Sequence, residues 1–126
     1  MWRHRALIGV LSLLPALTVS AADCLDYGPI QLSGRLVRQT YAGPPDYESV
    51  TKGDRPIVIY VLQLDSTLCV ADSRIVGLGT RELQLEWSAG DPASFLGRKV
   101  TVTGELTRGG ARHDKRFVIV ASRITP

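Results

Sequence analysis

The 126-residue sequence is poor in the residue types on which most catalytic and metal sites depend. It has only two histidines and two cysteines, and its serines stand in no nucleophile motif. It also has no glycine-rich phosphate-binding loop. A zinc site normally takes three or four protein ligands, which so few histidines do not supply. We therefore expect no enzymatic activity, no metal centre and no cofactor.

Internal repeats and low-complexity tracts are absent as well, and aromatic residues make up only 6% of the chain. Proteins that bind single-stranded nucleic acid combine basic grooves with aromatic side chains on which bases stack. Several of the few aromatic residues here stand at positions expected in the core. We therefore do not expect nucleic acid as the partner.

The first 22 residues have the pattern of an export signal that is cleaved from the mature protein. Two arginines precede an apolar run from Ala6 to Val19, and small residues follow from Ser20 to Ala22. A membrane-spanning helix is the alternative, but it needs about 20 apolar residues. This run is shorter, and Pro15 interrupts it. We expect a periplasmic or secreted protein with no transmembrane segment after cleavage.

Loss of the signal changes the charge balance. The whole chain has 15 lysines and arginines against 12 acidic residues. Removal of Arg3 and Arg5 leaves 13 against 12, which lowers the formal net charge from +3 to +1. A general attraction to nucleic acid is not expected at that charge, so any electropositive site must be local. Residues 23–126 are enough for one small domain, which we expect to be a monomer.

The two cysteines of the mature chain, Cys24 and Cys69, predict a single disulfide. An exported protein meets an oxidising compartment in which free thiols do not persist. Two buried free thiols are the alternative. On the chain-entropy model, a bond that closes a loop of about 46 residues stabilises the fold by roughly 4 kcal/mol.

Alternating apolar residues predict five β-strands. In "IQLSGRLV" the apolar positions share one face, and Gly34 in the middle indicates a sharp bend of the kind that closes a barrel. The second strand, "IVIYVLQLD", is predicted to end at Asp65, with Cys69 just beyond it. The other three strands are predicted from the following segments: "RIVGLGTRELQLEW", "KVTVTGEL" and "RFVIVASRI".

A short helix is predicted between the third and fourth strands. Asp91 suits the N-cap, Pro92 the first helical position, and Gly97 the residue after the end. Phe95 and Leu96 are expected to plug one end of a barrel. The order of three strands, a short helix and two strands predicts an all-β fold, a small five-stranded OB-like barrel. A small β-sandwich is the alternative, but it usually needs about seven strands.

Three segments carry a resemblance to a known family: "GPPDYESVTKGDRP", "YVLQLDSTLCV" and "FLGRKVTVTGEL". Together with His113, the one histidine that remains once the signal and its His4 are removed, they resemble the exported bacterial family called domain of unknown function 4431. The resemblance covers Cys24 to Ile124 and implies a small extracytoplasmic OB-type domain without an assigned activity. Family members often carry adjacent histidines in the last loop, whereas here Asp114 follows His113, so a histidine-pair metal site is not expected.

The fourteen residues from Gly43 to Pro56 form an unusually long connection between two strands. Two prolines stiffen it, Tyr47 and Val50 are expected to pack back on the barrel, and "KGD" turns the chain into the next strand. An ordered loop of this kind fixes its side chains. We predict a recognition surface made of the aromatic ring and its charged neighbours: Asp46, Tyr47, Glu48, Asp54 and Arg55. The alternative is that Tyr47 only caps the barrel and the charges are solvated.

The connection "TRGGARHDKR" between the last two strands is locally basic. Arginine forks suit carboxylate, phosphate or sulfate groups, so this loop predicts contacts with an anionic partner. The predicted contacts are these: Arg108, Arg112, His113 and Arg116. A soluble hairpin tip protected by its charge is the alternative.

A third surface, in the strand before the short helix, is predicted to have no function. Glu82, Gln84 and Glu86 share one face of that strand, which we expect to be exposed to solvent. The function predicted for the whole chain is a non-enzymatic binding module that recognises an anionic glycan, peptide or protein surface of the cell envelope through the two loops. A structural accessory domain without a ligand is one alternative, and an oligonucleotide-binding OB domain is a weaker one.

Overall fold

The computed structural model describes residues 24–72, 75–110 and 115–126, with the backbone alone for residues 75–78. The predicted export signal lies outside the described residues, as do Arg112 and His113. The chain forms these elements: β1 (Gly28–Ala42), η1 (Val50–Lys52), β2 (Pro56–Asp72), β3 (Ile75–Trp87), η2 (Pro92–Phe95), β4 (Lys99–Arg108) and β5 (Phe117–Thr125). No helix of the described part is long and apolar enough to cross a membrane.

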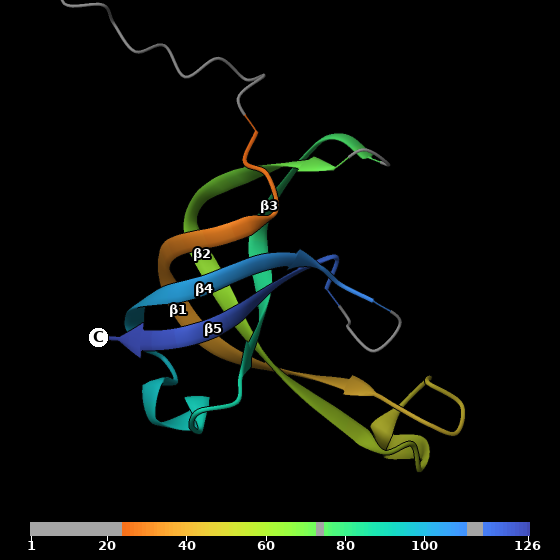
Figure 1. Cartoon of the computed structure of the whole chain (residues 1–126). Helices are drawn as coiled ribbons and strands as arrows, with labels where there is room; N and C mark the ends of the chain where they lie inside the picture. Colours follow the sequence, from red (N-terminus) through yellow and green to blue (C-terminus); the bar gives the residue numbers. More distant parts are fainter. Residues whose placement is uncertain (1–23, 73–74, 111–114) are drawn as a thin grey trace, which may run out of the picture.

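The five strands close into a barrel in the order β1-β2-β3-β5-β4, with β4 returning to β1 (Figure 1). β3 and β5 are parallel, and the other neighbouring strands are antiparallel. This is the OB-like plan that the order of elements predicted, so the prediction of fold class is confirmed.

Inward-facing apolar side chains from all five strands fill the barrel, as the alternation predicted. Phe95 and Leu96, beside η2, are partly buried against this core and close one end of it, as expected. The helix itself is a single 3₁₀ turn, in which Ala93 donates its N–H to the predicted cap Asp91. The buried core consists of these residues: Leu36, Leu62, Val70, Leu83, Leu85, Val100, Val102, Leu106, Phe117, Ile119, Ala121 and Ile124.

Gly34 lies where β1 passes from one neighbour to the other. It stands opposite Leu64 of β2 and also opposite Val100 of β4, so both strands approach its backbone. A Cβ atom at this position would lie 2.3 Å from the carbonyl oxygen of Gln63. Only glycine fits there, which explains the glycine that the sequence placed in the middle of a strand.

β2 is longer than the sequence predicted. It continues past Asp65 to Asp72, so the prediction that Cys69 lies beyond its end is wrong. The register of β2 against β3 shifts between Gln63 and Leu68, which marks an irregularity with extra residues in β2. Such an irregularity interrupts the alternation of side chains, and this interruption made the strand seem to end early.

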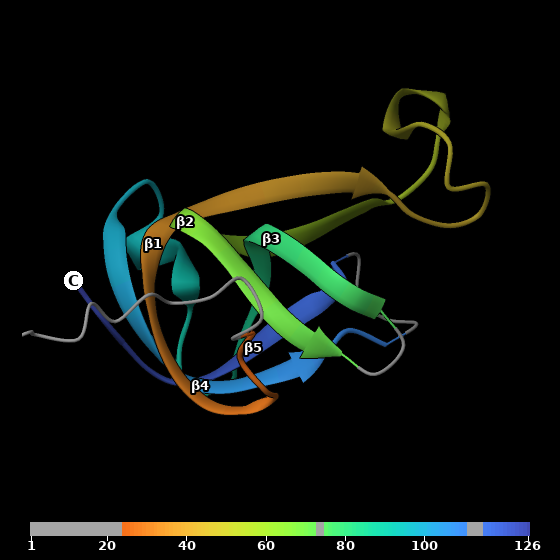
Figure 2. The same ribbon diagram turned by 90° about the horizontal axis from the view of Figure 1, so that it is seen from above.

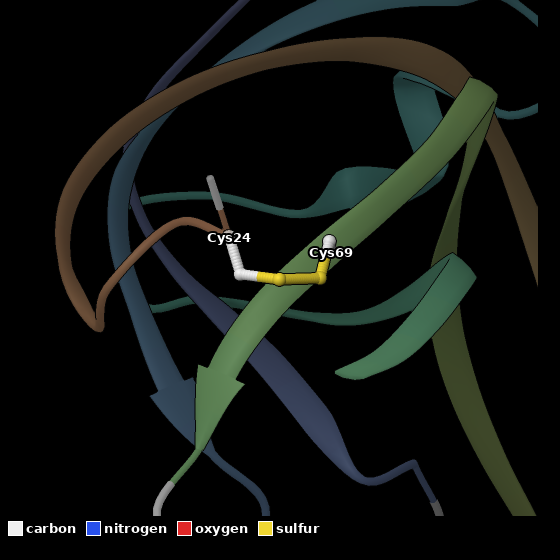
Figure 3. The surroundings of a disulfide bond; sticks show 2 residues. All are labelled: Cys24 and Cys69. Carbon is white, nitrogen blue, oxygen red and sulfur yellow. A yellow bond between two sulfur atoms is a disulfide. The ribbon is translucent and has the colours of Figure 1, made fainter. Parts of the chain in front are cut away.

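Cys24 and Cys69 form the predicted disulfide, with their Cα atoms 4.7 Å apart (Figure 3). The bond ties the N-terminal segment to β2. Next to it, Leu25 donates its N–H to the Cys69 carbonyl (2.9 Å) and accepts from the Ala71 N–H (2.8 Å). The bond and the two hydrogen bonds together hold this segment parallel to the last part of β2.

β1 and β2 extend beyond the barrel as a two-stranded arm, which projects away from it in both views (Figures 1 and 2). In this arm, residues 56–59 of β2 pair with residues 39–42 of β1, and β3 pairs with β2 only from Tyr60 onward. The connection from Gly43 to Arg55, with η1, forms the tip of the arm. The long connection is thereby carried clear of the barrel.

Candidate functional site

The tip of the arm is organised around one carboxylate. Asp54 is 5% exposed, and its two oxygens accept the backbone N–H groups of Asp46 (3.0 Å), Glu48 (2.8 Å) and Ser49 (2.9 Å). These hydrogen bonds, that from Ser49 foremost, lower the pKa of Asp54 below its ordinary value. The carboxylate is therefore charged at neutral pH and holds one side of the loop, and both of its oxygens are occupied by the loop's own backbone.

Backbone hydrogen bonds fix the two ends of the same loop. Gly43 donates its N–H to the Arg55 carbonyl (2.7 Å), and Arg55 donates to the Pro44 carbonyl (2.9 Å). After the turn of η1, Gly53 has a φ of 105° and turns the chain into β2, as "KGD" predicted. The connection is an ordered loop whose own backbone and one buried carboxylate determine its shape.

This loop presents Tyr47 to solvent. Tyr47 is 66% exposed and Val50 is 43% exposed, so the prediction that both pack back on the barrel is wrong. The backbone of Tyr47 has a φ of 55°, a left-handed conformation that is uncommon outside glycine, and its N–H is bonded to the Gly43 carbonyl (2.9 Å). Because the loop turns at Tyr47, the ring points outward, and the neighbouring Asp46 and Glu48 are exposed too.

Arg108, at the base of the second loop, already has a partner within the molecule. Arg108 bonds both carboxylate oxygens of Asp72, a side chain that is only 1% exposed, through its Nε (3.0 Å) and its terminal nitrogen. Tyr27 donates its hydroxyl to the same carboxylate (2.5 Å), and burial, followed by this hydrogen bond, raises the pKa of Tyr27. Arg108 thus neutralises a buried charge, which removes it from the set of groups free to bind an anionic partner.

Lys115, at the other end of that loop, folds across the outer side of the barrel. Its ammonium group lies 2.8 Å from a carboxylate oxygen of Glu82 and 5.8 Å from the centre of the Tyr41 ring. Its backbone N–H bonds the side-chain oxygen of Gln84 (3.3 Å). Gln39 donates to the same Glu82 carboxylate (3.3 Å). A polar network therefore joins the second loop to β1 and β3.

Under this network the outer face of the sheet is buried. Gln84 is 7% exposed, so the prediction of a solvated face over Glu82, Gln84 and Glu86 is wrong for Gln84, whereas Glu86 is exposed. In neighbouring strands, Val61 and Val118 stand opposite Gln84 and are fully buried. This is the strand 2–3 face at which OB domains commonly bind their ligands. Here Lys115, at the end of the second loop, covers part of that face.

The predicted site residues thus fall into three groups. Asp46, Tyr47, Glu48 and Arg55 are exposed at the tip of the arm, and Arg116 is exposed at the end of the second loop. Arg108 belongs to a buried ion pair. Arg112 and His113 lie outside the described residues. No group of three or more metal-binding side chains is found in the described part of the chain.

Two of the arrangements that shape the site have no signal in the sequence. Tyr27 and Arg108 lie 45 and 36 positions from Asp72 along the chain, and only the closed barrel brings the three residues together. The contact of Lys115 with Glu82 spans 33 positions. Comparisons of the chain with protein-family models, curated proteins and solved structures gave no match.

Proposed function

We propose that this domain is a non-enzymatic binding module of an exported protein and that it recognises a protein surface through the tip of the arm, with Tyr47 as the central contact. The observation that carries this proposal is the loop that Asp54 holds in shape while Tyr47 remains 66% exposed. The Cys24–Cys69 bond supports export to an oxidising compartment.

An ordered loop with an exposed ring is suited to protein recognition for two reasons. Side chains and loops that are already fixed lose little conformational entropy on binding, so more of the contact energy appears as affinity. Tyrosine is enriched among the residues that dominate binding energy, because its ring buries a large apolar area and its hydroxyl finds a polar partner. Val50 adds a second exposed apolar side chain on the same loop.

The expected anionic partner has less support from the geometry than the aromatic contact. Arg108 is engaged with Asp72, so Arg116 is the exposed arginine of the second loop within the described residues. The tip itself carries two exposed acidic residues, Asp46 and Glu48, directly beside Tyr47 in the chain, and two exposed basic residues, Lys52 and Arg55, further along. These acids favour a partner surface with a basic rim. We therefore propose a protein partner rather than an anionic glycan.

A structural accessory domain is the second candidate function. The observation that favours it is the buried outer face, where Lys115 and Gln84 cover positions at which OB domains commonly bind ligands. On this account Tyr47 has no partner, and the two proposals differ in what lies next to the ring in the cell envelope.

Photo-crosslinking in the producing cell distinguishes the two functions. A photoreactive phenylalanine derivative replaces Tyr47, and a second variant carries it at Ser88, an exposed position between β3 and η2. We expect a discrete crosslinked protein at position 47 and none at position 88. Equal crosslinking at the two positions, or none at either, would refute the proposed binding function and favour a structural domain.

A further inference from the structure

A narrow cavity opens on the side of the barrel between β1 and β2. The two strands pair up to Gly34 and Leu64, and then they separate because β1 turns to β4. The irregular part of β2 leaves a depression of about 260 Å³, with an apolar floor formed by Leu32, Leu64 and Leu68. Ser33, Ser66 and Thr67 line the same cavity, and the Ser33 hydroxyl is hydrogen-bonded to that of Thr101 (3.0 Å). We call it the β1–β2 slit.

The size and lining of the slit suit one amphipathic side chain. Sites for drug-sized ligands usually measure about 300–1,000 Å³, so a space of about 260 Å³ is small for such a molecule. An aromatic ring with one polar end can lie on the leucines and place its hydroxyl among the serines and the threonine. Tyrosine has this combination of an apolar body and a polar tip.

Basic groups surround the slit. Asp65, in its wall, pairs with the Lys99 ammonium (2.8 Å), and its carbonyl accepts a hydrogen bond from the Arg81 guanidinium (2.9 Å). Arg35 stands opposite Lys99 in the β1–β4 register and is exposed. Its guanidinium bonds the Gly97 carbonyl, so only Lys99 contacts the Asp65 carboxylate itself. Three exposed basic side chains therefore surround one acidic side chain, and the rim carries an excess of positive charge.

The tip of the arm complements this rim. Tyr47 is flanked directly by Asp46 and Glu48, both exposed, while the third carboxylate of the loop, Asp54, is occupied by backbone N–H groups. The exposed cations of the loop, Lys52 and Arg55, follow Tyr47 by five and eight positions, so the charges next to the ring in the chain are acidic. An acid-flanked tyrosine on one molecule thus matches a base-rimmed slit of suitable size on another. Complementary charges of this kind orient an encounter and favour the correct partner.

The two surfaces lie far apart on the same molecule. The arm projects away from the barrel in both views (Figures 1 and 2). β2 runs extended from Pro56, at the base of the tip, to Leu64, in the slit, and eight residues at about 3.3 Å each separate the two by roughly 26 Å. The arm of a molecule therefore does not fill its own slit. A contact between different surfaces of identical molecules is heterologous, and repeated contacts of this type build a chain or a ring.

We infer that the β1–β2 slit binds Tyr47 of a second copy of this domain, so that the domains associate head to tail. The inference rests on the proposed function in one respect, since it takes Tyr47 as the contact residue, and it adds the identity of the partner. One side chain and its charged neighbours bury less than the roughly 1,200 Å² of stable interfaces. The association of the free domain is therefore weak, with a dissociation constant on the order of 0.1–1 mM.

Sedimentation equilibrium of the oxidised mature protein, from about 10 µM to about 2 mM, tests the inference over that range of affinity. We expect an average mass that rises with concentration beyond that of a dimer. Tyr47→Ala removes the ring, and Ser66→Trp fills the slit from an exposed position; each variant is expected to stay monomeric. Ser88→Trp adds the same bulk outside the slit and is expected to associate like the unchanged protein.

A mixture of the two monomeric variants gives the sharpest result. Tyr47→Ala retains an open slit, and Ser66→Trp retains its tyrosine, so an equimolar mixture can form one heterologous contact and no second one. We expect heterodimers that do not grow further, with each variant melting cooperatively on its own. A mature protein that stays monomeric throughout, a monomeric mixture, or unchanged association of Ser66→Trp would overturn the inference. If position 47 still crosslinks to a different protein, the proposed function survives that result.

Discussion

Replacement of Gly34 by valine tests the point at which the barrel closes. The first side-chain atom would lie 2.3 Å from the Gln63 carbonyl oxygen and 2.9 Å from its carbon, and contacts under 3.0 Å are essentially never found. Both atoms belong to the backbone of β2, so no side-chain rotation relieves the clash. The strands must separate beside the buried core, an overpacking that typically costs about 1–3 kcal/mol. For a domain of about 100 residues, each kcal/mol lowers the melting temperature by roughly 4–8 °C.

The assay is thermal unfolding followed by circular dichroism, with two comparison variants. Gln31→Val places the same side chain at an exposed position of the same strand, and Gly110→Ala alters an exposed glycine of the second loop. We expect Gly34→Val to lose at least 5 °C, and both comparison variants to lose less than half as much, because exposed substitutions usually change stability by about 0.5 kcal/mol. Equal losses in the three variants would refute the close approach of β1 and β2 at Gly34.

Three further predictions concern the disulfide, the loop and the outer face. The double variant Cys24→Ser/Cys69→Ser should lose roughly 4 kcal/mol in urea unfolding, since the bond closes a loop across a separation of 45 residues; a loss below about 1 kcal/mol would contradict the chain-entropy argument. Asp54→Ala should accelerate amide hydrogen exchange in the tip of the arm and leave the barrel amides unchanged, whereas undiminished protection would show that the carboxylate does not hold the loop. The hydrogen bond from Lys115 lowers the pKa of Glu82 in the folded protein. The pair therefore stabilises the fold fully above the unfolded pKa of about 4.3, and this stabilisation is lost as the pH falls through the lower folded pKa. Lys115→Met should flatten the fall in stability between about pH 5 and pH 2, and an unchanged pH profile would disprove the coupling.

Features encoded by neighbouring residues were predictable from the sequence. The alternation around Leu83 and Leu85 and the β-branched run before Leu62 depend on side-chain periodicity alone, and both segments form strands. Gly34 and the cap at Asp91 are local signals as well, because each reflects what one backbone position requires. The order of these elements was sufficient to predict the closed barrel.

Features that depend on distant residues were not predictable in the same way. Gln84 is buried where β3 pairs with β5, and its side chain accepts the N–H of Lys115, 31 positions away. The pairing of Arg108 with Asp72 likewise joins the ends of two strands that are 36 positions apart. In a sequence, every charged residue of a loop is a possible binding contact. Only the folded structure shows which of these side chains are already paired within the molecule.

For the tip of the arm, the sequence indicated an ordered loop but not its internal arrangement. Prolines and glycines showed that the chain turns there, and the acidic residues all looked equivalent. In the structure Asp54 differs from Asp46, because its carboxylate turns inward and binds three backbone N–H groups. The Tyr47 side chain stays exposed to solvent, whereas the sequence predicts that it packs against the barrel.

The central claim is that Asp54 holds the loop in the shape that makes Tyr47 a binding contact. A double-mutant cycle of Asp54→Asn and Tyr47→Ala tests it most directly, with affinity for the protein crosslinked at position 47 measured by calorimetry and Val58→Ala as the exposed control on the arm. We predict at least a tenfold loss of affinity for Tyr47→Ala, a smaller loss for Asp54→Asn, and no further loss when Asp54→Asn is added to Tyr47→Ala. Unchanged affinity of Tyr47→Ala, or fully additive losses in the double variant, would contradict the claim.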